Sequence, residues 1–264
     1  MRQSFTPTLV LFCLSILCLV ISVTSSNRVI ASEARIAVAS NFNETLKLLA
    51  KNFAAETGHK ITIIPGSTGK LFAQIKHGAP FDAFFSADIK RAKLLEQDGL
   101  AHPGSRFTFA IGKIILWSPD PDFIDPEAKV LKNKDYRYLA LANPKLAPYG
   151  KAAQDTLEAI GLWKTLLNRI VQGENISQTY QFVKSGNAKL GFVAMSQVKK
   201  PGQTIKGSYW LVPQSLYTPV EQQAVQLKDN PTASKFLSYV QSDAAVKVIQ
   251  TFGYDIHSGN ENAQ

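Results

Sequence analysis

The sequence contains only two cysteines, Cys13 and Cys18, and both lie in an apolar segment near the N-terminus. If that segment is removed by processing, the remaining chain has neither a disulfide nor a thiol group. Catalysis by a cysteine nucleophile is then excluded. Burial of apolar side chains must stabilise the fold without covalent cross-links.

The sequence is poor in histidine as well, and its histidines have no spacing typical of a metal site. We expect surface or helix-capping roles for all of them: His59, His77, His102 and His257. The Gly-x-Ser-x-Gly motif of serine hydrolases is absent. A nucleotide phosphate loop around Gly69-Lys70 is also excluded, because Ile64 and Leu71 occupy positions that require Gly and Ser or Thr.

Long apolar runs are confined to the N-terminus. Arg2 precedes the apolar run 9–23, which polar and then small residues follow. This layout is typical of a secretory signal peptide, and we interpret residues 1–31 as a cleaved leader. A membrane anchor, the alternative, needs about 20 apolar residues, which is more than the run contains. The large residues Phe12 and Leu17 before the cysteines argue against lipid attachment, so we expect a soluble periplasmic protein.

The sequence is moderately basic. Its 29 Lys and Arg residues exceed its 20 Asp and Glu residues, which gives a formal charge of +9. Removing residues 1–31 removes Arg2 and Arg28 and no acidic residue, so the charge falls to +7. The basic residues are dispersed, without the stripes typical of nucleic-acid-binding proteins. We therefore expect modest steering of small anions and no nucleic-acid partner.

The most informative stretch is 36–41, an apolar strand pattern that ends in Ser40 and Asn41 and leads into a helical pattern over 43–57. The first N–H groups of a helix have no partner within the helix and carry partial positive charge. A strand that delivers small polar side chains to such a point builds a site for an oxygen-rich anion.

Three later stretches repeat this arrangement, at 65–69, 147–150 and 174–177. Each taken alone has an ordinary explanation as a helix cap, and Asn41 with Glu44 matches a capping box. Tyr149, between Pro148 and Gly150, either packs on the surface or donates a hydrogen bond to a ligand. We predict that four helix starts, two from each of two lobes, converge on one small oxyanion.

Strand and helix patterns alternate from about residue 36 to residue 99 and again from 138 to 193. This predicts an α/β protein in which each lobe is a mostly parallel sheet flanked by helices. A β-rich stretch at 107–117 marks a crossing between the lobes, and strands within 208–227 return. We predict four parts with a ligand cleft between the lobes: leader 1–31, lobe I 32–112, lobe II 113–218, and the rest of lobe I 219–264.

Five motifs, in this order and spacing, resemble the periplasmic molybdate-binding proteins of ABC importers. They are Ala-Val-Ala-Ser-Asn-Phe (37–42), Gly-Ser-Thr-Gly-Lys-Leu (66–71), Gly-Ala-Pro-Phe-Asp-Ala-Phe-Phe-Ser-Ala-Asp (78–88), Asn-Pro-Lys-Leu-Ala-Pro-Tyr-Gly (143–150) and Gly-Glu-Asn-Ile (173–176). The resemblance covers nearly the whole mature chain. It implies the two-lobed type II periplasmic binding fold, and capture of molybdate or tungstate for a membrane permease and its ATPase. It implies no cofactor and no catalysis, and we expect a monomer.

The resemblance also implies which residues bind the anion. The family's donors fall on Ser40, Asn41, Ser67, Thr68, Tyr149 and the backbone N–H at Ile176. A one-residue length difference leaves the choice between Ser67 and Thr68 open, and Tyr149 could use its hydroxyl or its N–H. Some members have a binding tyrosine where this chain has Ala194, and Tyr149 could replace it.

Neutral donors suit molybdate because the dianion only accepts hydrogen bonds. Three alternatives stay open: a receptor for sulfate, phosphate or another small solute, a periplasmic enzyme, and a sensor domain for a signalling partner. A ferric-ion receptor is disfavoured because no Tyr-Tyr pair occurs. The enzyme alternative requires a His, Asp or Glu facing the cleft, and we expect none in contact with the anion.

Overall fold

The computed structural model describes residues 32–133 and 135–256. The predicted leader, both cysteines and His257 lie outside these residues, and nothing in the structure bears on them. None of the helices in the described ranges has the length and apolar character that a membrane crossing needs.

The first of two sheets has the strand order β2-β1-β3-β10-β4. Its strands are β1 (Glu33–Ala39), β2 (Lys60–Gly66), β3 (Ala83–Ser86), β4 (Phe107–Gly112) and β10 (Val220–Gln226). The helices that pack on it or follow its strands are η1 (Ser40–Phe42), α2 (Asn43–Thr57), α3 (Thr68–Lys76), α4 (Ile89–Gln97), α10 (Pro231–Val240) and α11 (Asp243–Thr251). We call this half lobe I.

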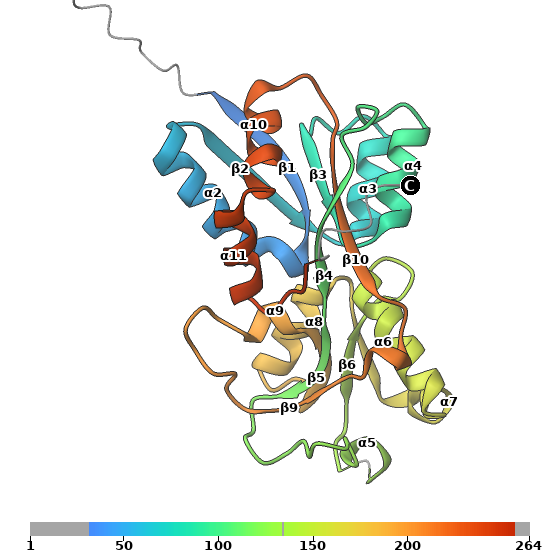
Figure 1. The fold of residues 1–264 in the computed structure, drawn as a ribbon. Coiled ribbons are helices and arrows are strands. Elements are labelled where there is room, and N and C mark those ends of the chain that lie inside the picture. The colour runs from blue at the N-terminus through green and yellow to red at the C-terminus, as the bar shows by residue number, and fades with distance from the viewer. Residues whose placement is uncertain (1–31, 134, 257–264) are drawn as a thin grey trace, which may run out of the picture. The chain divides into compact units, whose positions relative to one another are not determined.

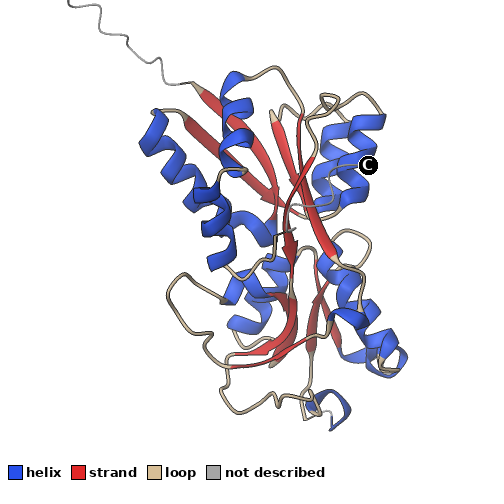
Figure 2. Cartoon of the chain, viewed as in Figure 1, coloured by secondary structure: helices blue, strands red, loops and turns tan. Residues whose placement is uncertain are grey.

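The second sheet has the strand order β7-β6-β8-β5-β9. Its strands are β5 (Ile114–Ser118), β6 (Leu139–Ala142), β7 (Ile170–Gly173), β8 (Leu190–Ala194) and β9 (Ser208–Leu211). Its helices are α5 (Val130–Asn133), α6 (Pro148–Ala159), α7 (Trp163–Leu166), η2 (Leu167–Arg169), α8 (Ile176–Lys184), α9 (Met195–Val198) and η3 (Gln214–Leu216). We call this half lobe II; Figure 2 shows helices around both sheets.

Two connections join the sheets. Strand β4 of the first sheet continues into β5 of the second through Lys113 alone, and the chain returns from β9 to β10. Figure 1 shows β10 running beside β4. The returning strand is antiparallel to both of its neighbours, β3 and β4. The strand that leaves lobe I and the strand that returns to it are therefore paired side by side.

Both sheets are mixed rather than mostly parallel. In lobe I, β1 is parallel to β2 and β3, whereas β10 makes two antiparallel pairings. In lobe II, β6 is parallel to β7 and β8, whereas β5 makes two antiparallel pairings. The antiparallel pairings involve the strands that run between the lobes, and the βαβ repeats that the sequence pattern reveals form only the parallel part.

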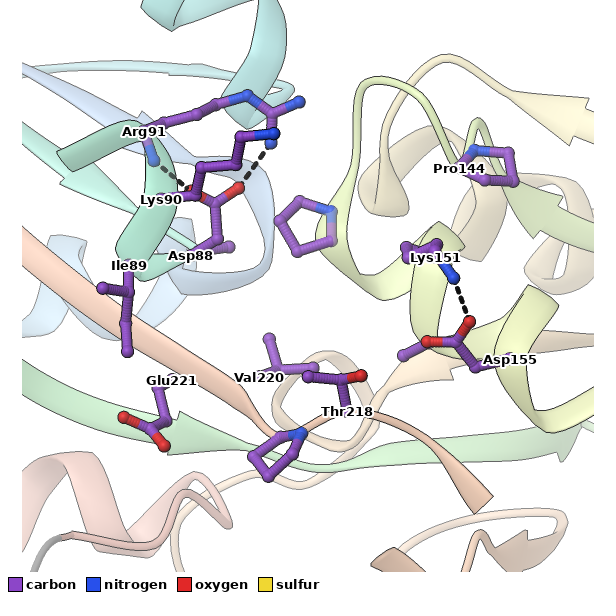
Figure 3. Close-up of a pocket in the computed structure, with 14 residues that line it drawn as sticks. Asp88, Ile89, Lys90, Arg91, Pro144, Lys151, Asp155, Thr218, Val220 and Glu221 are labelled. Carbon is purple, nitrogen blue, oxygen red and sulfur yellow. Dashed lines mark hydrogen bonds and ion pairs between the residues drawn. The ribbon is translucent and has the colours of Figure 1, made fainter. Parts of the chain in front are cut away.

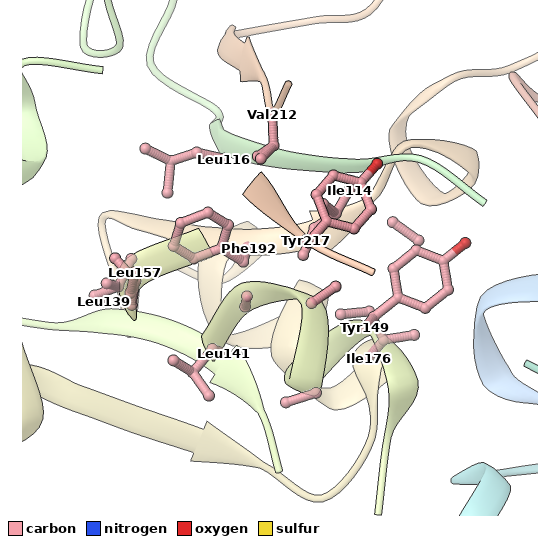
Figure 4. Packing of buried hydrophobic residues seen from close by; sticks show 14 of the residues in the cluster. Ile114, Leu116, Leu139, Leu141, Tyr149, Leu157, Ile176, Phe192, Val212 and Tyr217 are labelled. Carbon is pink, nitrogen blue, oxygen red and sulfur yellow. The ribbon is translucent and has the colours of Figure 1, made fainter. Parts of the chain in front are cut away.

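Apolar side chains fill both faces of each sheet. In lobe I, the rings of Phe42, Phe85 and Phe109 pack against one another beneath α2 and α10. In lobe II, one cluster extends from Leu157 to Tyr149 at the beginning of α6. Figure 4 shows that the hydroxyl of Tyr149 points out of this cluster. Tyr149, the largest fully buried side chain in the described part of lobe II, thus has an apolar body and a polar end at the boundary of the core.

Candidate functional site

The register of the parallel strands in lobe I brings two predicted site residues together. Ala39, the last residue of β1, lies opposite Gly66, the last residue of β2. The following residues are Ser40 and Ser67, and both come directly before or at a helix start. Adjacent parallel strands end at the same edge of a sheet, which is where ligands bind in α/β folds.

Lobe II repeats this geometry. Ala142 at the end of β6 lies opposite Gly173 at the end of β7. Helices α6 and α8 begin a few residues after these strand ends. A side chain at Gly150 would overlap the carbonyl of Ala142, so glycine lets the first turn of α6 lie directly against the strand end.

All six residues predicted to bind an anion line one cavity. Lobe I contributes Ala39, Ser40, Asn41, Gly66, Ser67, Thr68 and Ala87, and lobe II contributes Ala147, Pro148, Tyr149, Asn175 and Ile176. These lining residues include no Lys, Arg, His, Asp or Glu. The cavity can therefore offer a ligand neutral N–H and O–H groups but no counter-ion.

The hydroxyls of Ser67 and Thr68 in lobe I differ in whether they make hydrogen bonds within the protein. The side chain of Ser67 is buried and its Oγ has no hydrogen-bond partner. Oγ1 of Thr68 accepts a hydrogen bond from the N–H of Ala87 at 3.4 Å, which leaves its proton available. A buried polar group without a partner costs about 1–3 kcal/mol, so the lone Ser67 hydroxyl is a donor available to a ligand at this point of the cavity.

Asn41 does not make the capping box that its spacing from Glu44 predicts. The N-cap of α2 is Phe42, without a side-chain cap. Nδ2 of Asn41 donates to Oε1 of Gln222 at 2.7 Å and to the hydroxyl of Tyr254 at 3.1 Å. Both amide protons are thus used inside the protein. The donor that Asn41 can still offer is its backbone N–H in the first turn of η1.

The beginning of α8 leaves one N–H group unpaired. Asn175 is the N-cap, and its Oδ1 accepts from the N–H groups of Ser177 and Gln178, both at 3.0 Å. Ile176 is the first helical residue, and its N–H has no acceptor within the helix. Ile176 lines the cavity, so its N–H is a donor available to a ligand there.

Tyr149 is the second residue of α6, after Pro148, and no side chain caps this helix. Burial raises the pKa of the Tyr149 hydroxyl well above its ordinary value, and the nearby Tyr254 and Tyr217 hydroxyls act in the same direction. The hydroxyl therefore stays protonated and able to donate. A side chain at Gly112 would overlap this hydroxyl, so the glycine at the end of β4 makes room for Tyr149.

Contacts around the cavity hold the two lobes together. The N–H of Gly69 donates to the carbonyl of Leu146 at 2.9 Å, and Nη2 of Arg91 donates to the carbonyl of Lys145 at 3.0 Å. Lys70 of lobe I pairs with Glu174 of lobe II. Each lobe supplies part of the lining, so the cavity is complete only when these contacts form.

A larger pocket of about 530 Å³ lies beside the cavity and shares Ala87 and Pro148 with it. Figure 3 shows its two ion pairs, Asp88 with Arg91 and Lys151 with Asp155. The Asp88 side chain also accepts from the N–H of Arg91, so Asp88 caps α4. Three acidic and three basic side chains line this flanking pocket, and two of the basic ones are already paired with carboxylates, so it offers a dianion no net positive charge.

Sequence reasoning did not identify Gln222, Tyr254 or Gly112. They lie far from the four helix starts in the sequence, and the residues around them form no recognisable motif. In the described ranges, the structure also contains no group of three His, Cys, Asp or Glu side chains that could hold a metal ion.

Comparison with known proteins identifies the family. The family model described as bacterial extracellular solute-binding protein matches residues 34–255. The chain belongs to this family. The family is one of binding proteins, which confirms the expectation that the chain binds a solute and is not an enzyme.

The chain is similar to two curated molybdate-binding proteins named ModA. The one from Azotobacter vinelandii is 44% identical over 229 residues, covering 86% of this chain and 91% of the relative. The one from Rhodobacter capsulatus is 44% identical over 228 residues, covering 85% and 88%. The solved periplasmic molybdate-binding protein of Azotobacter vinelandii matches with a TM-score of 0.83 and 42% identity, over 84% of this chain and 99% of that one. The resemblance and the two-lobed type II fold that the sequence predicts are confirmed.

Proposed function

We propose that this chain captures molybdate or tungstate in the cavity between its lobes and delivers the anion to an ABC importer. Two relatives that are 44% identical over most of the chain are named molybdate-binding proteins. The observation that carries the proposal is the convergence of neutral donors from both lobes on one cavity without a charged lining residue.

The donor set matches the chemistry of a fully deprotonated oxyanion. We assign hydrogen bonds to the hydroxyls of Ser40, Ser67 and Tyr149 and to the backbone N–H groups of Asn41 and Ile176, with Thr68 as a further hydroxyl within the same lining. Each such bond to a charged group contributes about 1.5–3 kcal/mol. Of the two loop hydroxyls, Ser67 is the stronger candidate, because its Oγ has no other partner.

Other tetrahedral oxyanions are the competing ligands. Hydrogen phosphate carries a proton that needs an acceptor, and no carboxylate lines the cavity. Sulfate has the same charge and the same four oxygens as molybdate, but it is smaller. The size of the closed cavity must therefore discriminate between them.

We further propose the route by which the chain acts. Residues 1–31 direct export and are cleaved, and the mature protein is a periplasmic monomer without a cofactor that docks on a permease with its ATPase. Lobe I comprises 32–112 and 219–264, and lobe II comprises 113–218. The similar solved protein from Azotobacter vinelandii is periplasmic, which supports this location.

Isothermal titration calorimetry of the purified protein with molybdate, tungstate and sulfate tests the proposal. We expect one tight site for molybdate and tungstate and much weaker binding of sulfate. Ser40→Ala combined with Tyr149→Phe should weaken molybdate binding by a factor of about 100 or more, because it removes two hydrogen bonds to the anion. Binding of sulfate in preference to molybdate would refute the proposed ligand.

A further inference from the structure

The hydroxyl of Tyr149 must be oriented in order to serve an anion. A phenol donates one hydrogen bond and accepts others, and its proton can point to either side in the plane of the ring. A donor on one side of the phenol oxygen directs the phenol proton to the other side, where an anion in the cavity could accept it. The structure contains such a donor.

Gln222 lies on β10, is fully buried, and does not line the cavity. Its Nε2 donates to the hydroxyl of Tyr149 at 3.4 Å. The pairing of β10 with β4 is irregular between Gln222 and Gln223, and such irregularities redirect side chains. A side chain at Gly112 would occupy the space in which the amide and the hydroxyl meet.

The orientation of the Gln222 amide is set by Asn41. Nδ2 of Asn41 donates to Oε1 of Gln222 at 2.7 Å, so the carbonyl end of the amide faces Asn41 and the Nε2 end faces Tyr149. Asn41 is held in turn by the Tyr254 hydroxyl, which accepts from Nδ2 at 3.1 Å.

The network also reaches lobe II by a second path. The Tyr254 hydroxyl lies 2.9 Å from Oγ of Ser196, and Ser196 donates to the carbonyl of Asn41 at 3.1 Å. Ser196 belongs to α9 of lobe II, whereas Asn41 belongs to lobe I. The amide of Gln222 is thus held within a buried network that spans both lobes.

We propose that Gln222 is a positioning residue that keeps the Tyr149 hydroxyl as a donor toward the bound oxyanion. Gln222 donates to the phenol oxygen, so the phenol proton is directed away from Gln222 and toward the cavity. The inference rests on the proposed function. It adds to the site a supporting residue that lies on a strand, outside the four helix starts. A residue on β10, the strand that returns from lobe II to lobe I, therefore determines the direction in which the Tyr149 hydroxyl donates.

A double-mutant cycle tests this role, with sodium molybdate as the titrant. The variants are Gln222→Met, Tyr149→Phe and the two combined, and Gln222→Leu replaces Gln222→Met if the latter does not fold. We expect Gln222→Met to weaken binding about tenfold. In the Tyr149→Phe background the same substitution should have almost no further effect, because the hydroxyl that Gln222 orients is already gone.

The matched control is Gln223→Met on the same strand. Gln223 donates to Oγ1 of Thr108 at 3.0 Å and accepts from Arg106 at 2.9 Å, and it has no contact with the cavity. This control should bind molybdate like the wild type. Thermal unfolding of each variant separates loss of affinity from loss of folding.

Each outcome decides between the two proposals. If the wild type does not bind molybdate, the proposed function fails and the role of Gln222 fails with it. If the wild type binds and Gln222→Met leaves the affinity unchanged, only the role of Gln222 is refuted. Equal losses from Gln222→Met in the presence and absence of the Tyr149 hydroxyl would also refute it, because they would indicate a general structural effect.

Discussion

The hydroxyl of Ser40 in lobe I donates to Oδ1 of Asn175 in lobe II at 3.3 Å. That oxygen already accepts from the N–H groups of Ser177 and Gln178, both at the shorter distance of 3.0 Å. Asn175 therefore caps α8 at two N–H groups and holds Ser40 only loosely. The Ser40 hydroxyl can change its acceptor from Asn175 to a ligand at little cost.

Ser67→Ala should weaken molybdate binding about 10- to 100-fold while leaving thermal stability nearly unchanged. The Ser67 hydroxyl has no partner in the protein, so its removal deprives only the anion of a hydrogen bond. The matched control is Ser242→Ala at the N-cap of α11, where Oγ accepts from the N–H of Ala245 at 3.3 Å. That variant should lose about 1 kcal/mol of stability and keep its affinity. Calorimetry and thermal unfolding of both variants check the contrast.

The hydrogen bond from the Gly69 N–H to the Leu146 carbonyl should contribute more to closure of the two lobes than the Lys70–Glu174 ion pair does. The side chains of that pair are 52% and 42% exposed, and exposed pairs contribute about 0–1 kcal/mol. Lys70→Met should thus change affinity less than about fivefold. Gly69→Ala would place a methyl group 3.1 Å from Cα of Leu146, and we expect faster dissociation in stopped-flow measurements. A larger increase in the dissociation rate from Lys70→Met than from Gly69→Ala would contradict this order.

Stability should fall at alkaline pH because buried tyrosines must stay protonated. Burial raises the pKa of Tyr136 to about 12 and raises the pKa values of Tyr149 and Tyr254 as well. A raised pKa means that the folded state holds the proton more tightly than the unfolded chain. This contribution is complete below about pH 10, the ordinary tyrosine value, and is lost as the pH rises further.

Tyr149→Phe should make the alkaline loss of stability less steep, because one fewer proton is released on unfolding. Melting temperatures measured between about pH 8 and pH 11 check this expectation. The matched control is Tyr209→Phe on β9, where the side chain is 40% exposed. An identical pH dependence in the wild type and Tyr149→Phe would contradict the burial argument.

Gly112→Ala should weaken molybdate binding strongly, because its methyl group would overlap the Tyr149 hydroxyl. Gly58→Ala is a control for general loss of stability, since Gly58 ends α2 with φ of 72° and lies in open space. The control should lower the melting temperature and leave the affinity unchanged. Equal affinities of Gly112→Ala and the wild type would show that this close packing is not needed for binding.

The pairs of helix starts could be predicted from the sequence because their arrangement follows from local rules. Parallel strands end at one edge of a sheet, so Ser40 and Ser67 had to lie together once β1 and β2 were paired. The same rule brings together the starts of α6 and α8. Each described strand or helix has at most 15 consecutive residues, which is a range that periodicity can reveal.

The supporting network could not be predicted, because its partners come from distant parts of the chain. Asn41 contacts Gln222 and Tyr254, which lie 181 and 213 residues away in the sequence. A capping role for Asn41 is the simpler local interpretation, but it is wrong because Asn41 lies within η1, and Phe42 occupies the N-cap position of α2. The antiparallel part of each sheet escaped prediction for a similar reason, since it depends on which strand returns between the lobes.

A crystal structure of the protein grown with molybdate, with anomalous data collected at the molybdenum edge, tests the central claim most directly. We predict one anomalous peak in the cavity between the lobes, with its oxygens in hydrogen-bond contact with Ser67, Tyr149 and the N–H of Ile176. A peak in the flanking pocket, or an ion in the cavity whose contacts come from one lobe alone, would contradict the account.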